Sequence, residues 1–193
     1  MSGIDGNQVV ADARQLYVQQ LVAFLRNRFA KDPAGAAEVP TERTNNPNLH
    51  GGHYRIDFVT SVKGKLDGSV VVELVPDRQL VIDHPIEGTA GTTRVRLEQL
   101  SWDDVEILHD VPGDMAALLA PWFAHWYDPD DKRAPAPGQP PPGVIHSLGI
   151  YPDALVIDFG TAPVDAFWSL IPLLRDAGAT MLTIRATRQL PPR

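Results

Sequence analysis

The chain has 193 residues, of which 44% are apolar and 21% charged, a composition that is typical of a globular protein and excludes a disordered one. It has no cysteine, which excludes disulfides, thiolate nucleophiles and sulfur-ligated zinc sites. The 17 Lys and Arg residues against 24 Asp and Glu residues give a formal charge of -7. This charge argues against binding to nucleic acid or anionic lipid, because both require clustered cations.

No targeting or membrane segment is expected. Residues 1–15 lack the basic region followed by an apolar region that marks a secretory signal. No apolar run approaches the ~20 residues that a membrane-spanning helix needs. We therefore expect a cytoplasmic protein.

A helix is predicted over residues 8–30, because apolar side chains recur there at three- and four-residue spacing. They are Val10, Ala13, Tyr17, Leu21, Phe24 and Leu25. Pro33 follows the helix and cannot continue its hydrogen-bond ladder. The next stretch, residues 33–52, is rich in Pro, Asn and Gly and is predicted to be a long surface loop.

A mostly antiparallel sheet is predicted next. In residues 53–62, apolar side chains such as Ile56 alternate with polar ones such as Arg55 and Asp57, which predicts one buried and one exposed face. Further strands are predicted at residues 70–75, 79–83 and 92–97. Their short connections favour a meander. Residues 102–108 fit either a strand or a short helix.

The strongest helical pattern starts at Met115 and places Trp122, Phe123 and Trp126 on one apolar stripe. Asp114 is the expected N-cap. Pro121 predicts a kink or a break into two short helices, because its ring clashes with the preceding turn.

A proline-rich segment divides the chain, since the sequence APAPGQPPPG at residues 134–143 favours extended polyproline II geometry. We predict a main α+β domain over residues 1–132, a Pro-rich connector over 133–143, and a β-β-α-β subdomain over 144–193. The subdomain is too short for an independent core, so it should pack on the main domain.

Within the subdomain, strands are predicted at residues 144–150 and 154–159, a helix at 163–177 and a strand at 180–186. Gly178 is well placed just after the helix. The crossover through this helix should be right-handed and should place the strands before and after it parallel in one sheet.

One pair of histidines has the spacing of metal ligands. His50 and His53 are separated by two glycines and followed by Asp57, which could supply an oxygen ligand. The same pattern fits a glycine-rich turn with two solvated histidines. The sequence therefore assigns no metal and no cofactor, and these three residues remain candidate ligands only.

Two further segments have the residue types of a site without its complete pattern. Asp83-His84 could form a carboxylate-oriented base, but adjacent strand residues point to opposite faces. The loop from Asp158 to Pro163 joins a strand to a helix, where α/β proteins bind ligands, yet it lacks a phosphate-binding glycine motif. Thr161 in this loop is expected to cap the following helix. The sequence identifies no catalytic residue.

The candidate partner-binding residues lie at the end of the tryptophan-rich helix. They are Trp126, Tyr127, Asp128, Asp130 and Asp131. Trp and Tyr are frequent anchors in protein interfaces, and the acidic turn beside them could attract a partner. The alternatives are an apolar stripe that belongs to the core and a solvated helix end. A calcium loop is not expected, because its glycine and terminal glutamate are missing.

The sequence favours a non-enzymatic protein-binding module, most concretely an acidic intracellular inhibitor of the immunity or antitoxin type. The reasons are the acidic charge, the lack of catalytic motifs and the aromatic residues beside an acidic turn. The partner is expected to be a protein, and the charge favours a basic one. The alternatives are a small hydrolase-like enzyme with a His/Asp site, with or without a metal, and a structural or assembly subunit. The oligomeric state stays open.

Overall fold

A computed structural model of the chain describes residues 6–43, 45–61, 70–133 and 143–188. It confirms the predicted α+β fold, with an N-terminal helix, a large and mostly antiparallel sheet, and further helices. The helices are α1 (Gly6–Lys31), α2 (Met115–Tyr127) and α3 (Val164–Asp176). The strands are β1 (Ala36–Glu42), β2 (Leu49–Val59), β3 (Val71–Val72), β4 (Ile86–Ala90), β5 (Thr93–Leu97), β6 (Val105–His109), β7 (Ser147–Ile150), β8 (Ala154–Asp158) and β9 (Met181–Ala186).

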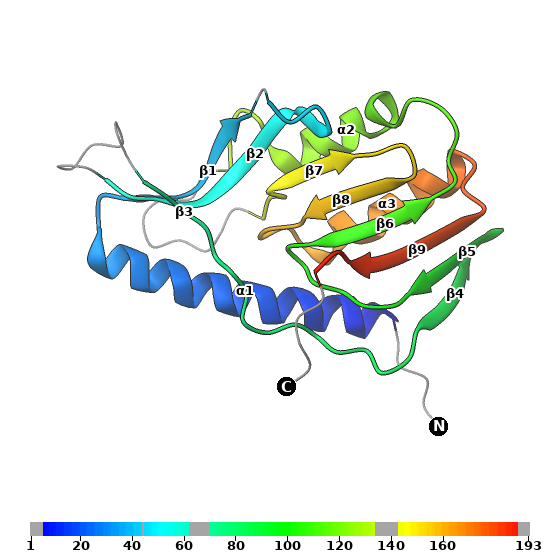
Figure 1. Cartoon of the computed structure of the whole chain (residues 1–193), viewed down its shortest axis with the longest axis horizontal. Helices are drawn as coiled ribbons and strands as arrows, with labels where there is room; N and C mark the ends of the chain where they lie inside the picture. The colour runs from blue at the N-terminus through cyan, green and yellow to red at the C-terminus, as the bar shows by residue number, and fades with distance from the viewer. Residues whose placement is uncertain (1–5, 44, 62–69, 134–142, 189–193) are drawn as a thin grey trace.

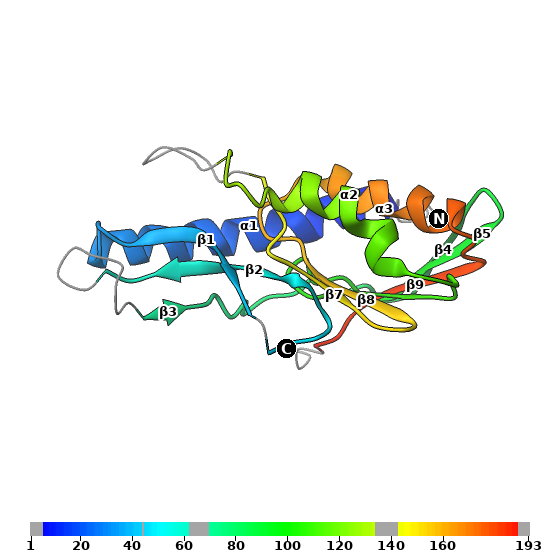
Figure 2. The ribbon, with the colours of Figure 1, turned by 90° about the horizontal axis from the view of Figure 1, so that it is seen from above.

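The three helices lie on one side of the sheet, as Figure 1 and Figure 2 show together. The burial of strand residues follows this division. In β6, Val105 and Ile107 are fully buried, whereas Glu106 and Leu108 keep partial exposure. The sheet therefore has a helix-covered face and a second face that no described helix covers, which we call the helix-free face.

The strands have the spatial order β1-β2-β7-β8-β6-β9-β5-β4, and β3 pairs with β2 beside this path. Every pairing is antiparallel except that of β5 with β9. β6 lies between β8 and β9 and is antiparallel to both, so β8 and β9 run parallel to each other. The crossover through α3 thus joins parallel strands of one sheet, as predicted, but these strands are not neighbours.

The segment predicted as a subdomain contributes its strands to the same sheet as the rest of the chain. β7 pairs with β2, and β6 inserts between two strands of the segment. Both parts also contribute to one hydrophobic core. Most of the predicted connector, residues 134–142, lies outside the described residues. At its two ends, Arg133 Nη1 donates to the carbonyl oxygen of Gly143 over 3.3 Å.

The prediction of a surface loop over residues 33–52 is wrong, because this stretch contains β1 and the start of β2. β1 pairs with β2 from Ala36 to Glu42 and is the first strand of the sheet order. An edge strand tolerates Pro40, since a proline without a backbone N–H needs no partner on the open side. The polar, proline-containing sequence therefore gave a misleading loop pattern.

The expected exposure of Arg55 and Asp57 is also wrong. Both residues of β2 are buried, with relative exposures of 3% and 5%, as are their apolar neighbours Ile56 and Phe58. The alternating pattern failed because side chains and backbone from distant segments cover both faces of β2 here. Arg55 contacts the end of α2, and Asp57 contacts His146.

The remaining strand predictions were correct in part. The strand predicted at residues 70–75 reduces to the two residues of β3, and residues 79–83 form only an isolated bridge between Leu80 and Leu100. Residues 105–109 form the strand β6, which resolves the open choice for that segment. The hairpin of β4 with β5 is local, but β5, β6 and β9 then interleave, so the sheet is not a simple meander.

The helix ends follow local sequence signals. Asp114 is the N-cap of α2, as predicted, and its Oδ1 accepts from the backbone N–H groups of Ala116 and Ala117. α2 continues through Pro121 as one helix, so the predicted break into two helices is absent. Gly178, with φ of 100°, ends α3 in a Schellman arrangement in which its N–H donates to Arg175 O over 2.9 Å.

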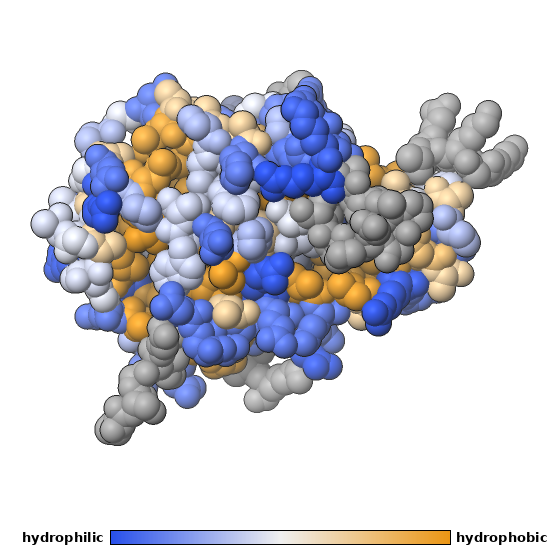
Figure 3. Space-filling view, turned by 180° about the vertical axis from the view of Figure 1, so that it is seen from behind, coloured by the Kyte–Doolittle hydropathy of each residue, from blue (hydrophilic) through white to orange (hydrophobic). Residues whose placement is uncertain are grey.

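The core lies between the helices and the sheet. Its largest fully buried side chains are Trp102, Tyr127, Phe58, Phe159 and Phe167. Seen from behind, the helix-covered side presents hydrophobic residues in patches separated by hydrophilic ones (Figure 3). Within the described ranges, no helix combines the length and the apolar composition needed to span a membrane.

Candidate functional site

The three candidate metal ligands do not form a metal-binding group. The His50 ring lies 4.7 Å from the Phe123 ring, and the His53 ring lies 5.5 Å from the Tyr127 ring, so both histidines pack on aromatic residues of α2. Asp57 instead contacts His146. In the part of the chain that the structure describes, no group of three or more His, Cys, Asp or Glu residues is arranged to hold a metal ion.

The acidic turn, Asp128 to Asp131, is mostly engaged inside the molecule. Tyr127 and Asp128 are buried, with relative exposures of 1% and 6%. Asp128 Oδ2 accepts from the backbone N–H of Arg133 over 2.7 Å. Of the five candidate partner-binding residues, this leaves Trp126 and Asp131 partly exposed and Asp130 exposed, with Asp130 in an ion pair with Lys132 at 2.6 Å.

One buried arginine fixes the conformation of the acidic turn. The Arg55 guanidinium donates twice to the carbonyl of Tyr127 and once each to the carbonyls of Asp128 and Glu38, and it pairs with Asp131 Oδ1 at 2.8 Å. Glu38, Asp128 and Asp131 are also the non-glycine residues with positive φ among those described. Such backbone conformations cost free energy and persist where surrounding contacts determine them. Arg55 supplies those contacts.

Asp83 and His84 do not form a base. Both are exposed, and neither side chain has a hydrogen bond or ion pair within the described ranges. The other candidate segment, the loop from Asp158 to Pro163, does contact ionisable residues. Asp158 and Thr161 belong to a buried cluster of such residues.

This buried cluster consists of Glu38, Asp57, His146, Asp158 and Thr161. His146 Nε2 lies 2.9 Å from Glu38 Oε1. On the other side of the ring, Nδ1 lies 3.2 Å from Asp57 Oδ1 and 3.8 Å from Asp158 Oδ2. Thr161 Oγ1 donates to Glu38 Oε1 over 2.7 Å, so Thr161 does not cap α3, whose N-cap is Pro163. Both ring nitrogens of the imidazole thus face carboxylates.

Strand register explains how the acidic residues meet. Ala37 pairs with Phe58 and Val39 with Ile56, so Glu38 of β1 stands opposite Asp57 of β2. Glu73, the residue directly after β3, lies on the other side of β2. Its Oε2 accepts from the backbone N–H of Asp57 over 3.0 Å. Like charges in one cross-strand row are destabilising unless a cation compensates them. His146, which directly precedes β7, supplies that positive charge.

The cluster shifts the pKa of its members in opposite directions. Burial alone would lower the pKa of His146, but Asp158, Asp57 and Glu38 outweigh it and raise the pKa well above its usual value. Burial works to raise the pKa of Asp57, but His146 and the Leu74 N–H outweigh it and lower the pKa. Partial burial beside Asp57 and Asp103 raises the pKa of Asp158 to about 8, against the opposing effect of His146. Asp57 is therefore the carboxyl group that ionises first, and Asp158 keeps its proton to a higher pH than an ordinary carboxyl group does.

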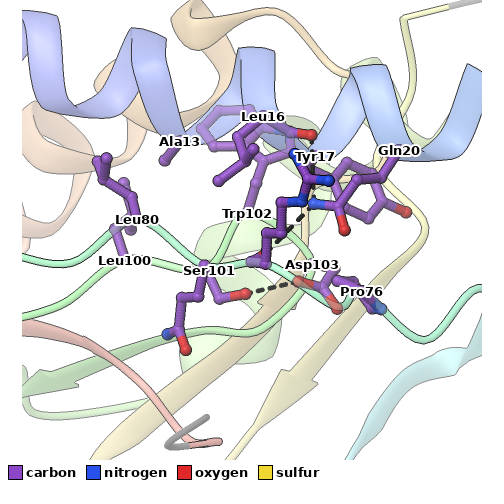
Figure 4. Close-up of a pocket in the computed structure, with 12 residues that line it drawn as sticks. Ala13, Leu16, Tyr17, Gln20, Pro76, Leu80, Leu100, Ser101, Trp102 and Asp103 are labelled. Atoms are coloured by element: carbon purple, nitrogen blue, oxygen red, sulfur yellow. Dashed lines mark hydrogen bonds between the residues drawn. The ribbon is translucent and has the colours of Figure 1, made fainter. Parts of the chain in front are cut away.

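The cluster is nearly closed to solvent. His146 and Glu38 have relative exposures of 1% and 4%, whereas the side chain of Asp158 keeps 28% exposure. A hollow between α1, the segment around Pro76 and residues 100–103 has a volume of about 10 Å³ (Figure 4). Such a space holds about one water molecule, so a substrate of ordinary size does not fit there.

Close packing extends to the loop after β8. Gly160 has φ of 47°, and a Cβ atom at this position would lie 2.1 Å from the His146 ring. The carbonyl of Gly160 also accepts from the Trp102 indole N–H over 3.1 Å. Only glycine combines this backbone conformation with this close approach. The loop therefore packs directly against the His146 ring of the cluster.

The helix-free face of the sheet presents side chains that no described helix covers. Across its middle, Glu106 of β6 stands beside Arg185 of β9, and the two side chains form an ion pair. Arg96 of β5 pairs with Glu87 at 2.8 Å and with Glu98 at 2.9 Å. This face therefore presents ordered, charged side chains on rigid strands.

The protein thus has an α+β fold in which the described helices cover one face of the sheet and leave the other face uncovered. Comparison with protein families, with curated proteins and with solved structures finds no match to this chain.

Proposed function

We propose that the protein is a non-enzymatic protein-binding module that binds its partner on the helix-free face of the sheet. The observation that carries this proposal is that all three described helices lie on the opposite face. Side chains on β strands have fixed relative positions, so this face is preorganised for a partner, and preorganisation lowers the cost of binding. The most concrete version is an acidic cytoplasmic inhibitor of the immunity or antitoxin type, since the charge of -7 attracts a basic partner.

The acidic turn is the competing binding surface. Asp130 is exposed and Trp126, on the last turn of α2, is partly exposed, so both are accessible to a partner. Tyr127 and Asp128 are buried within the chain, however, and Asp131 is engaged by Arg55. Three of the five candidate residues of this surface are therefore buried or engaged within the chain, and we favour the helix-free face.

Photo-crosslinking in cells of the source organism separates these surfaces. A photoreactive phenylalanine derivative replaces Thr183, which stands between Leu108 and Arg96 on the helix-free face. Matched positions are Ala124, exposed on α2, and Asp130 in the acidic turn. We expect one protein to crosslink from Thr183 and not from Ala124. Crosslinks from Asp130 alone would move the binding site to the acidic turn, and their absence from all three positions would contradict the proposal. The inhibitor version also requires the captured protein to lose its own activity in the complex.

The second candidate function is a small hydrolase-like enzyme that uses Asp57, His146 and Asp158. One observation favours it, because two carboxylates beside one imidazole have pKa values shifted apart, with Asp57 lowered and Asp158 raised to about 8. Such pairs often divide the roles of base and acid. Chromogenic esters, phosphate esters and glycosides provide a direct test. A hydrolytic rate that disappears in Asp158→Asn while the fold is retained would favour the enzyme.

A further inference from the structure

The strand β3 has one open edge. It pairs only with β2, with Val71 opposite Val59, and lies at the end of the sheet remote from β4 and β5 (Figure 1). The N–H of Thr60 on β2 donates to the carbonyl of Val70 over 3.0 Å. Hydrogen-bonded and non-bonded pairs alternate between antiparallel strands, so the backbone N–H and C=O of Val71 point away from β2. No described residue bonds them.

The alternation of a strand continues beyond the end of β3. Val71, Glu73 and Val75 are exposed, and the two residues between them are partly buried. The N–H of Leu74 donates to Asp57 Oδ2 over 2.7 Å, so this residue still faces β2. By the same alternation, the backbone groups of Glu73 and Val75 face away from β2, and they too have no hydrogen bond within the described ranges.

Residues 71–75, which we call the open edge, lack the features that protect strand edges. Proteins protect such edges with proline, lysine or a bulge, because unpaired backbone groups pair with further strands. The outer strand β1 contains Pro40 and, at Glu38, a residue with φ of 49°. The open edge has the sequence Val-Val-Glu-Leu-Val, and Pro76 comes only after it. Extended peptides bind exposed edges through main-chain hydrogen bonds, so a strand is the ligand that fits here.

The side chains of the open edge determine which strand fits best. Val71 and Val75 have relative exposures of 46% and 75%, and the exposed Glu73 lies between them in the sequence on the same face. The side chain of Phe58 points to the other face of β2 and packs against Phe29 of α1, so the Val-Glu-Val row belongs to the helix-free face. Directly opposite residues of paired strands share a face. A partner strand would therefore place alternate side chains beside this row.

Glu73 adds a negative charge to the row. Its Oε2 accepts from the backbone N–H of Asp57 over 3.0 Å, and no described Lys or Arg forms an ion pair with it. His146, the cation of the buried cluster, already faces Glu38 and Asp57. Partial burial and the charge of Asp57 raise the pKa of Glu73, despite the opposing effect of His146. A cation opposite Glu73 would therefore relieve an unfavourable interaction between carboxylates.

We propose that the open edge binds an extended segment of the protein partner as an additional antiparallel strand, with a lysine or arginine opposite Glu73 and aliphatic residues opposite Val71 and Val75. This inference rests on the proposed function and adds the binding mode and the chemistry of the partner segment. Main-chain hydrogen bonds would supply affinity, and the Val-Glu-Val row would supply selectivity. A second copy of the chain fits less well, because residues 71–75 of a copy carry no cation to place opposite Glu73.

A five-residue peptide and the full-length protein provide the test. Acetyl-Val-Thr-Lys-Thr-Val-amide is titrated into isotope-labelled protein. One control peptide has glutamate in place of lysine, and a second has an N-methyl group on the lysine nitrogen, which removes a main-chain donor. We expect amide shifts confined to residues 70–75 and the facing part of β2. Binding should be about three- to tenfold weaker for each control peptide, because a surface ion pair or a main-chain hydrogen bond is lost.

Substitutions in the protein separate the backbone contacts from the charge. Val71→Pro removes an N–H that points away from β2, so the pairing with β2 is retained while binding of the lysine peptide should weaken about tenfold. Glu73→Gln keeps an acceptor for the N–H of Asp57 but should reduce the preference for lysine over glutamate to about twofold or less. Asp83→Asn is the matched control, because it removes an exposed carboxylate outside the open edge and should leave the titrations unchanged.

Equal binding of the three peptides, shifts elsewhere, or an unaffected Val71→Pro variant would overturn the inference. A dimer of the free protein in analytical ultracentrifugation that Val71→Pro dissociates would also overturn it, because a second copy would then occupy the open edge. If the inference fails while crosslinks from Thr183 persist, the proposed function stands and only the strand-binding site is lost. If the lysine peptide binds as expected but no protein crosslinks, the proposed function fails, and with it the assignment of the open edge to a protein partner.

Discussion

His146 is charged inside the protein because carboxylates face both of its ring nitrogens. This arrangement makes the free energy of unfolding depend on pH, because the pKa of Asp57 is lowered whereas the pKa values of His146 and Asp158 are raised. Asp57 has a lowered pKa, so its contribution is present above the pKa of the unfolded chain and is lost as the pH falls. His146 and Asp158 have raised pKa values, so their contributions are lost as the pH rises through the folded-state values. Stability should therefore be greatest at mildly acidic pH.

Asp158→Asn should remove part of the decline in the free energy of unfolding that accompanies rising pH. The pKa of Asp158 is raised to about 8, so the folded state holds a proton that the unfolded state releases from about pH 4 upward. This proton gives the wild type a slope of at most about -1.4 kcal/mol per pH unit in this interval. Urea denaturation at several pH values between 5 and 8 measures the slope. Parallel curves for wild type and variant would show that Asp158 does not titrate as proposed.

Gly160→Ala should strongly destabilise the fold. The added Cβ would meet the His146 ring at 2.1 Å, and φ of 47° is unfavourable for alanine. Overpacking and backbone strain together predict a loss of about 2–4 kcal/mol in the free energy of unfolding. Gly88→Ala in the edge strand β4 is the control, since nothing lies within 4 Å of its Cβ position. Equal effects of the two substitutions in denaturant titrations would contradict the packing around His146.

Sequence reasoning found only part of the buried cluster. It singled out Asp57 and the loop that contains Asp158 and Thr161, but expected Asp57 to be exposed and Thr161 to cap a helix. It missed Glu38 and His146 because 108 residues separate them and no local spacing connects them. Their contact depends on the pairing of β1 with β2 and of β2 with β7. Such long-range register is not encoded in any short pattern.

At the scale of the elements, Arg55 connects β1, β2 and the C-terminal end of α2. Its guanidinium makes five hydrogen bonds, three of them to the carbonyls of Tyr127 and Asp128, where the last turn of a helix leaves acceptors unsatisfied. A cation at this end also interacts favourably with the helix dipole. The conformation of the acidic turn therefore depends on a residue 72 positions earlier in the chain.

Arg55→Lys should release this end of α2. One ammonium group cannot replace a planar donor set that contacts four residues, and the abandoned carbonyls are buried. We expect a loss of about 2–4 kcal/mol in stability and faster hydrogen exchange at the amide of Arg133, which bonds to Asp128. Arg96→Lys on the helix-free face is the matched control, with an expected loss below about 1 kcal/mol. A small effect of Arg55→Lys with unchanged exchange would show that the turn is stable without the guanidinium.

Elements with strong local signals were predicted well. The periodic apolar faces of α1 and α3, the Asp114 cap and the Gly178 helix end depend on neighbouring residues, and the structure contains all of them. β1 and β4 were missed, because both are edge strands with few apolar residues. An edge strand buries little surface of its own, so its pairing partner determines it more than its composition does.

At the scale of the whole molecule, the order of strands in the sheet determines how the chain can fold. β6 belongs to the first part of the sequence but lies between β8 and β9 of the last part. The indole N–H of Trp122 on α2 also donates to the carbonyl of Ala166 on α3 over 3.2 Å. Neither residues 1–132 nor residues 144–193 can form the observed sheet alone, although the sequence suggested two units divided by the Pro-rich connector.

Two fragments separated within the connector test this dependence. We expect residues 1–133 and residues 143–193 to be unfolded or aggregated when each is produced alone, because the first lacks the neighbours of β6 and the second lacks the strand between β8 and β9. Mixed from denaturant, they should recover the native spectrum, since the bonds between Arg133 and Gly143 and between Trp122 and Ala166 place the cut ends and the helices together. The intact chain should unfold in one transition, because a shared core has no boundary at which one part could unfold first. Far-ultraviolet circular dichroism and tryptophan fluorescence during urea titration measure both expectations. A cooperative transition in either isolated fragment would instead establish that this fragment folds independently of the other.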